Sequence, residues 1–497
     1  MLETHAGSTI TILDRIHQHE TFINVLPDDV LLQIFEWCRV GCNPLWSPFN
    51  PALDMHRLIH ICRRWRHLIF SSPHCLSVYL LCTYRTPASK NLGFWPAFPI
   101  VIDYTNYPDY NGKNLSPNDE DNVIAALKKP DRVRSLRLPV TSLLLGKVAS
   151  MTQDKFPILT QLWLSSNDED VSVLPGEILG GTAACMQEIH LEGIPFPSLP
   201  TFLSSTTNLV VLYLHRIPYT GYISPEVMAA SLAMLTRLGD LSIEFQSSTF
   251  SRDQSGTRGE ATLLTRVVLS ALTSFEFQGA SDYLENLVAH VDAPRLASIK
   301  ITYFDQLVFQ VPQLFRFAGQ TQVLEPAHFK YAQVNFRGSH VYIGLHSEQS
   351  ESGRSHFALR ILCQRLDWQV SRLAEVLSQS SPLLTNVDHL SIGAYDLQSS
   401  SQDDMDNIAW LELLRQFIAV KALRVSAQVA GHVADALKDV TVDMVPGIMP
   451  VLRLLFLEDE SARRVGDFIL TRQRFGLPVT LANSPPEFLR KRESQLL

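Results

Sequence analysis

The chain has 497 residues, of which 46% are apolar and 19% charged, enough apolar material for a large buried core. Its net charge of -8 disfavours duplex nucleic acid as the main partner, because duplex-binding proteins carry a basic excess that neutralises phosphates. No window reaches the roughly 18 uncharged apolar residues of a membrane span, so we expect no membrane partner.

The cysteines indicate a reducing compartment. Their number is odd, their spacing is irregular, and several lie inside apolar stretches, as expected for buried thiols. The first residues include acids and no continuous apolar stretch, which excludes a secretory signal. We therefore expect a protein of the cytoplasm or the nucleus. The cysteines are Cys38, Cys42, Cys62, Cys75, Cys82, Cys185 and Cys363.

The N-terminal segment predicts short amphipathic helices. Residues 8–22 favour a first one, and a second follows over 27–38. Pro27 suits the first helical position, and Asp28 and Asp29 suit the positive end of the helix dipole. The apolar positions of this second helix recur with a 3.6-residue period and are Val30, Leu31, Ile34, Phe35 and Cys38.

A loop rich in Gly, Asn and Pro separates this helix from a further one over 53–70, and 74–81 predicts a short helix or strand. The apolar positions of the helix over 53–70 are Leu58, Ile61, Cys62, Trp65 and Leu68. A helical unit this small is marginal alone, so part of its apolar face is expected to meet either the following domain or a partner. In the first case the helices only cap the rest of the chain.

The next segment, 83–130, forms a transition. It contains an apolar β-branched run that predicts a strand at 99–104, then a polar loop. A helix is predicted over 121–129, with Asp119 or Asp121 as its N-cap.

A short pattern, apolar-x-x-apolar-x-apolar, recurs from residue 133 onward. Between 133 and 301 its intervals run from 23 to 34 residues, close to the leucine-rich-repeat period of roughly 20–29. Each match predicts a strand whose last two apolar side chains point inward, preceded by a turn that carries a third. The matches are 133–138, 159–164, 186–191, 209–214, 238–243, 272–277, 296–301, 387–392, 420–425 and 452–457.

Helical stretches such as 225–235 and 283–291 lie between these strands, and one strand plus one helix per repeat buries a continuous core when repeats stack. The pattern fades over 302–386, where alternation suggests further strands of drifting length. The Asn or Cys that usually follows the strand of such repeats is generally missing. An ordinary α/β domain of alternating strands and helices is the alternative.

These patterns predict an α/β chain with a short N-terminal three-helix segment and an irregular leucine-rich-repeat-like solenoid. The predicted parts are an N-terminal helix or tail, a helical domain, the transition segment, the repeat domain and a C-terminal tail. Their bounds are 1–22, 23–82, 83–130, 131–475 and 476–497.

The N-terminal helices resemble an F-box, a motif that starts with Leu-Pro and an apolar helix and ends with a Val/Ile-Cys-x-x-Trp helix. The matching residues are Leu26-Pro27, Val30-Leu31, Ile34-Phe35, Ile61-Cys62-Arg63-Arg64-Trp65 and Leu68. The rest of the chain is similar to fungal F-box-like proteins, especially those of mushroom-type fungi. Segments that carry this likeness include FPIVIDY, LSPNDEDNVIAAL, HLEGIPFPSLP, GYISPEVM, LTRVVLSALTSFEFQG, YLENLVAHVDAPRL, WLELLRQFIAVKALRV and FLEDE.

The resemblance implies a binding role. In the family, the F-box docks on the Skp-type adaptor of a cullin–RING ubiquitin ligase, and the repeats present a protein substrate. The positions that would meet the adaptor or form the core beneath it are Leu26, Pro27, Val30, Leu31, Ile34, Phe35, Ile61, Cys62, Trp65 and Leu68. Some twenty residues separate the two helices where many F-boxes have fewer.

No pattern predicts catalysis, a cofactor or a metal site. His56, His60 and Cys62 lack a second ligand pair at metal-like spacing, and phosphate-loop, dinucleotide-binding and hydrolase motifs are missing from the sequence. Gly180-Gly181 predicts a turn after a helix over 176–179, and the acidic stretch 167–170 a connecting loop. An enzyme with a loop-built pocket is the third and least supported hypothesis, after the ligase subunit and a ligase-independent scaffold.

Overall fold

The computed structural model divides the chain into two compact units, Met1–Arg137 and Leu138–Leu497, and each is described by itself. It describes residues 25–40, 58–72, 79–86, 88–93, 97–105, 115–168, 171–181, 183–246, 266–321, 328–347, 356–379, 383–396, 407–458 and 460–482. The helix predicted over 8–22 lies outside them. Among the described residues no helix is both long and apolar enough to cross a bilayer.

The first unit combines helices α2, α4, α5 and α6 with a small parallel sheet in which β2 pairs with β1 on one side and with β3 on the other. Strand β2 confirms the strand predicted at 99–104, and the last element, β3, crosses the boundary between the units. The elements are α2 (Asp28–Val40), α4 (Arg63–Ser71), β1 (Leu80–Cys82), α5 (Ala88–Asn91), β2 (Ile100–Asp103), α6 (Pro117–Leu127) and β3 (Val133–Pro139).

Helix α6 confirms the predicted helix but not its predicted start. Ser116 is the N-cap, and its Oγ accepts a hydrogen bond from the backbone N–H of Asp119. Pro117 therefore occupies the first turn, where its missing N–H costs nothing. The two proposed caps, Asp119 and Asp121, lie inside the helix, because the Ser-Pro pair before them already satisfies the cap.

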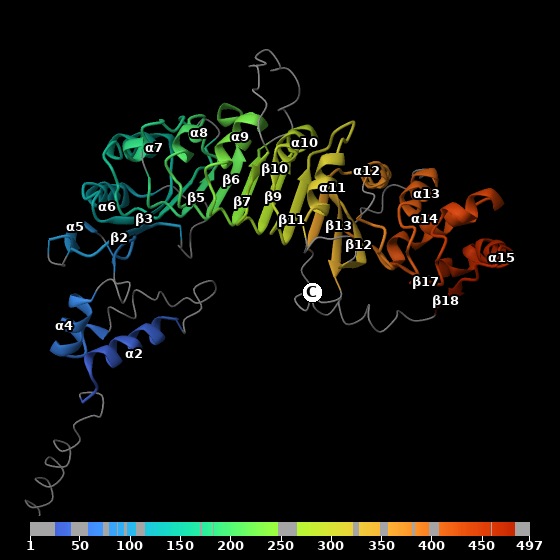
Figure 1. The fold of residues 1–497 in the computed structure, drawn as a ribbon, viewed down its shortest axis with the longest axis horizontal. Helices are drawn as coiled ribbons and strands as arrows, with labels where there is room; N and C mark the ends of the chain where they lie inside the picture. The colour runs from blue at the N-terminus through green and yellow to red at the C-terminus, as the bar shows by residue number, and fades with distance from the viewer. Residues whose placement is uncertain are drawn as a thin grey trace, which may run out of the picture. The chain divides into compact units, whose positions relative to one another are not determined.

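The second unit is built on a long sheet of mostly parallel strands with helices packed along one side (Figure 1). Its strands run in the order β4-β5-β6-β7-β9-β11-β14-β13-β12-β15-β16-β17-β18. They are β4 (Gln161–Ser165), β5 (Glu188–Glu192), β6 (Val211–Ile217), β7 (Asp240–Phe245), β9 (Ser274–Gly279), β11 (Ser298–Tyr303), β12 (Phe329–Arg337), β13 (His340–Ser347), β14 (Phe357–Leu362), β15 (His389–Tyr395), β16 (Ala422–Val425), β17 (Leu454–Leu457) and β18 (Thr480–Leu481).

Helices and 3-10 turns link these strands, and successive helices pack on one another. Two strands, β8 (Val267–Val268) and β10 (Val291–Asp292), pair in a separate small sheet. The helices are α7 (Ser142–Met151), α8 (Leu199–Leu203), α9 (Pro225–Leu232), α10 (Ser281–Ala289), α11 (Pro312–Gly319), α12 (Leu366–Ser378), α13 (Asn407–Arg415), α14 (Ala427–Lys438) and α15 (Gly466–Arg474). The 3-10 turns are η2 (Ile178–Gly181), η3 (Tyr219–Gly221), η6 (Val442–Gly447) and η7 (Glu460–Val465).

The repeat pattern is confirmed, because each of its ten matches coincides with a parallel strand. In every match all three apolar positions are buried, as Leu159, Leu162 and Leu164 illustrate at the start of the second unit. The helices predicted over 225–235 and 283–291 are α9 and α10. This regular alternation of strand and helix makes the second unit a solenoid of the leucine-rich-repeat type.

Backbone hydrogen bonds take the place of the missing Asn or Cys. After each of three successive strands, a backbone N–H reaches the carbonyl of the next strand: Val140 to Ser165 (2.8 Å), Ser166 to Glu192 (2.8 Å) and Gly193 to His215 (2.9 Å). Buried backbone groups need such partners. Direct bonding between adjacent loops supplies them here without a side-chain ladder.

The stretch 302–386 contains the predicted strands in an arrangement that the sequence did not predict. β12 and β13 form a hairpin around Gly338-Ser339, and β13 is antiparallel to both neighbours. The hairpin lies between β14 and β15, so the parallel run resumes only at β15. An inserted hairpin explains why the repeat spacing fades here. At the other end, β18 lies within the part predicted as a tail, 476–497.

Candidate docking site on the N-terminal helix pair

The helix pair α2–α4 has a small apolar core of its own. Phe35 and Trp65 meet edge to face with 4.8 Å between ring centroids. Phe98, from the segment after the pair, packs into the same cluster and lies 5.3 Å from the ring of Phe70. The buried members are Leu31, Phe35, Ile59, Trp65, Leu68, Ile69 and Phe98. Because a core this small buries little area, each large side chain contributes much of its stability.

Arg64 ties the two helices together at their edge. Its Nε and Nη2 donate to Asp28 Oδ1 at 3.1 and 2.6 Å, and Nη2 also donates to the carbonyl of Leu26. The side chains of Arg64 and Asp28 are 39% and 62% exposed, so solvent limits this ion pair to about 0–1 kcal/mol. Its role is to fix the Leu26-Pro27 turn against α4.

The helix predicted over 53–70 is not continuous. Its residues 53–57 lie outside the described part of the chain, Leu58 is helical, residues 59–61 form a turn, and α4 begins only at Arg63, with Cys62 as its N-cap. The Sγ of Cys62 accepts a hydrogen bond from the backbone N–H of Trp65 at 3.4 Å. Ile61 lies in the turn and is 59% exposed, so its apolar side chain is not part of the helix stripe. The apolar spacing continues through the turn, which is why it suggested one helix.

An exposed apolar stripe runs along α2, on a different side from the buried positions. Pro27 is exposed, Val30 and Ile34 are half-buried, and Trp37 is 77% exposed. At about 100° per residue these four positions fall within an arc of about 80°, adjacent to the arc of Leu31 and Phe35. We call Pro27, Val30, Ile34 and Trp37 the docking stripe. Its four side chains are apolar, and none of them is titratable.

The ten residues expected to serve the adaptor thus divide into two groups. Leu31, Phe35, Trp65 and Leu68 are buried in the core of the pair, whereas the other six keep some or most of their surface. Those six are Leu26, Pro27, Val30, Ile34, Ile61 and Cys62. Trp37 is not among the ten predicted positions. Its position seven residues after Val30, on the same helix face, was the signal that would have identified it.

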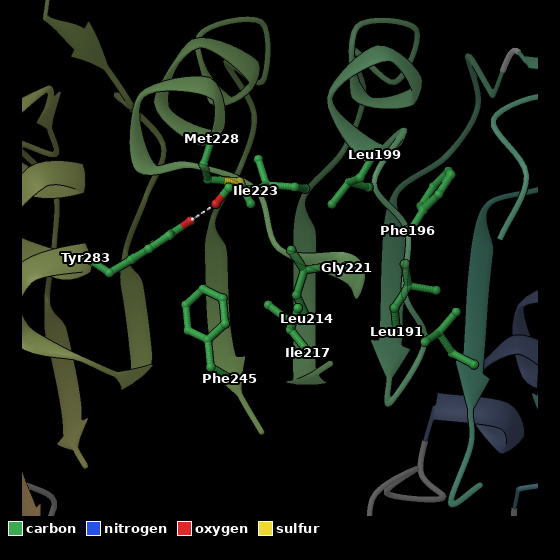
Figure 2. Close-up of a pocket in the computed structure, with 11 residues that line it drawn as sticks. Leu191, Phe196, Leu199, Leu214, Ile217, Gly221, Ile223, Met228, Phe245 and Tyr283 are labelled. Carbon is green, nitrogen blue, oxygen red and sulfur yellow. Dashed lines mark hydrogen bonds between the residues drawn. The ribbon is translucent and has the colours of Figure 1, made fainter. Parts of the chain in front are cut away.

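The second unit contains a small apolar pocket between neighbouring repeats (Figure 2). Its one titratable lining group is Tyr283, whose hydroxyl donates to the carbonyl of Ile223 at 3.0 Å. Burial raises the pKa of Tyr283 well above its usual value, so the phenol stays neutral and bonded. The lining residues are Leu191, Ile194, Phe196, Leu199, Leu214, Ile217, Gly221, Ile223, Met228, Phe245 and Tyr283. This pocket is a gap in core packing, without an acid, base or nucleophile that could act in water.

No family model and no curated protein matches this chain. Among solved structures, it is similar to the leucine-rich repeat-containing protein LegL7 from Legionella pneumophila. The two are 11% identical with a TM-score of 0.24, over 73% of this chain and 95% of that one. The class of this protein follows from its own geometry: a mixed α/β chain whose large parallel sheet forms a leucine-rich-repeat-like solenoid.

Proposed function

We propose that the docking stripe binds the Skp-type adaptor of a cullin–RING ubiquitin ligase, and that the repeat unit presents a protein substrate to it. The observation that carries this proposal is the exposure of Pro27 and Trp37 beside half-buried Val30 and Ile34, on a helix whose core face is already filled. The mechanism is binding, and we propose no enzymatic role. The F-box resemblance of 26–35 and 61–68 supplies the identity of the partner.

The spacing of the stripe suits docking in a groove. A helix that lies in an apolar groove uses anchors at i, i+4 and i+7, which here are Val30, Ile34 and Trp37. Each large apolar side chain that becomes buried contributes roughly 1.5–3 kcal/mol. Single exposed apolar residues are common on protein surfaces, whereas several on one helix face mark an interaction site.

Replacing both Ile34 and Trp37 with alanine is expected to weaken adaptor binding by at least about 2 kcal/mol, or roughly thirtyfold in Kd. The measurement is isothermal titration calorimetry of the full chain with a purified Skp-type adaptor. Leu143→Ala is the matched control, because Leu143 is 81% exposed on α7 of the other unit. If the unmutated, folded chain binds no adaptor, or the double variant binds as tightly, the proposal is wrong.

The ligase-independent scaffold keeps one supporting observation, the contact of the helix pair with Phe98. In that function the pair only covers apolar surface of the segment that follows it. A chain that starts at residue 73 keeps β1 but loses both helices. If the protein is such a scaffold, the shortened chain should aggregate and the intact chain should not bind the adaptor. A monodisperse shortened chain would count against it.

A further inference from the structure

Aromatic side chains line the helix-free face of the sheet where β4, β5 and β6 lie side by side. Trp163, His190 and Tyr213 occupy matching positions in the strand register, and His215 follows two residues later on the same face of β6. All four are half-buried. We call these four residues the aromatic row.

The rings of the aromatic row contact one another in sequence. Trp163 stacks on His190 with 5.2 Å between centroids, and the edge of His190 meets Tyr213 at 4.6 Å. Tyr213 in turn stacks on His215 at 5.6 Å, and His215 Nε2 is 2.9 Å from Ser242 Oγ. These contacts already hold the four rings in place. Binding of a ligand to the rings therefore costs little conformational entropy of these side chains.

Carboxylates border the aromatic row on both sides. Glu188 and Glu192 lie two residues before and after His190 on β5. Asp240 and Glu244 lie two residues before and after Ser242, the β7 residue in register with Tyr213. Glu188 accepts from the amide of Gln161 at 3.1 Å, and Glu244 from that of Gln278 at 3.0 Å.

These hydrogen bonds come from neutral amides and do not neutralise the carboxylates, although His215 and Arg216 offset part of the charge at Glu244. Among the described residues, Lys or Arg forms an ion pair with Glu192 (Arg216, 3.1 Å) and Glu276 (Lys300, 3.7 Å), but not with Glu188, Asp240 or Glu244.

The pKa of Tyr213 agrees with a local negative field. Burial raises the pKa of Tyr213, and the charges of Asp240, Glu276 and Glu188 raise it further. Burial also raises the pKa values of Asp240 and Glu244. A cation placed at the row would therefore lower the energy of several ionised groups at once.

We propose that the aromatic row and its carboxylate border form a binding surface for an arginine-bearing extended segment of a partner protein. A guanidinium can stack on an aromatic face and donate two parallel hydrogen bonds to a carboxylate, and here an aromatic ring and a carboxylate lie two residues apart on the same face of a strand, as His190 and Glu188 do. The ammonium of lysine offers the charge without the planar fork. This surface lies in the second unit and does not depend on adaptor binding by α2.

The test is fluorescence anisotropy of labelled peptides with alternating glycine and arginine, lysine or glutamine, titrated with the full chain. The arginine peptide is expected to bind at least about fivefold tighter than the lysine peptide, and the glutamine peptide not to bind. Raising the salt concentration should weaken binding, because the contact is partly ionic.

Tyr213→Ala is expected to weaken binding of the arginine peptide at least about tenfold, whereas Tyr213→Phe keeps the ring and the binding. Glu188→Gln combined with Asp240→Asn should produce a similar loss of binding by removing charge alone. This double variant tests the proposal even if the Tyr213→Ala chain does not fold. Tyr331→Ala is the matched control. Tyr331 also stacks on a histidine, His389 of β15, but the neighbouring carboxylate of Asp388 forms an ion pair with Lys421 at 3.5 Å.

Equal binding of arginine and glutamine peptides, or full binding by both the tyrosine and the carboxylate variants, would overturn the proposal. So would a loss in Tyr331→Ala as large as in Tyr213→Ala. The Ile34/Trp37 double variant should bind the peptide normally. Failure of adaptor docking and failure of this surface are therefore separate results.

Discussion

Arg472→Leu is expected to lower the free energy of unfolding of the C-terminal repeats by about 3–5 kcal/mol. Arg472 lies in α15 with its side chain fully buried. Its Nη1 donates to the carbonyls of Ile448 and Met449, both at 3.2 Å. Its Nη2 donates to those of Pro450 (3.1 Å) and Leu452 (3.2 Å). Leucine would leave these mostly buried oxygens without their donor, and each such loss costs about 1–3 kcal/mol.

The same guanidinium holds an unusual stretch of backbone. Met449 has a φ of 43°, a left-handed conformation that non-glycine residues rarely adopt. Arg472 fixes the carbonyls on either side of that residue. Burial lowers the pKa of Arg472, so part of the gain from its bonds offsets the cost of burying a charge.

Native-state hydrogen exchange of η6, β17 and α15 is the appropriate measurement, because a solenoid can open locally at one end. Arg472→Lys keeps the positive charge but loses the planar guanidinium with its several donors. Its exchange protection should therefore lie between those of the wild type and Arg472→Leu. Unchanged exchange in the leucine variant would show that water or backbone shifts replace the lost donors.

Trp65→Ala is expected to destabilise the helix pair by about 3–5 kcal/mol, the usual cost of removing a buried Trp. Trp65 is 8% exposed, packs edge to face on Phe35, and belongs to a core in which seven of the described residues are buried. A loss of this size is large relative to what such a core can provide, so the pair should open. Hydrogen exchange of α2 and α4 would then become fast while β4–β7 keep their protection.

Trp37→Ala is the matched control for this variant, since it removes the same side chain from the same pair at a 77% exposed position. It should change stability by no more than about 0.5 kcal/mol. Loss of adaptor binding by Trp37→Ala with unchanged exchange would locate the effect at the interface. Equal destabilisation by the two variants would contradict the division between core and docking stripe.

The inward positions of every repeat followed from the sequence, because strand periodicity and apolar spacing are local properties. All three apolar positions of each match are buried, from Val133 to Leu457. The start of α2 at Asp28 followed in the same way from Pro27 and the acidic first turn. The α4 boundary was wrong since the cap at Cys62 uses a sulfur acceptor, and cysteine is not a usual N-cap residue.

The sequence alone determined two N-terminal helices and the stacked strand–helix repeats, since each of these elements is encoded by its neighbours along the chain. The predicted three-helix segment is not confirmed, because its third element ends in strand β1. Only the tertiary structure decided which side chains remain available. It buried Phe35 and Trp65 against each other and left Trp37 exposed. It also brought Trp163, His190 and Tyr213 into one row across three strands. Such neighbours are set by strand register and helix docking, which join residues that are distant in sequence.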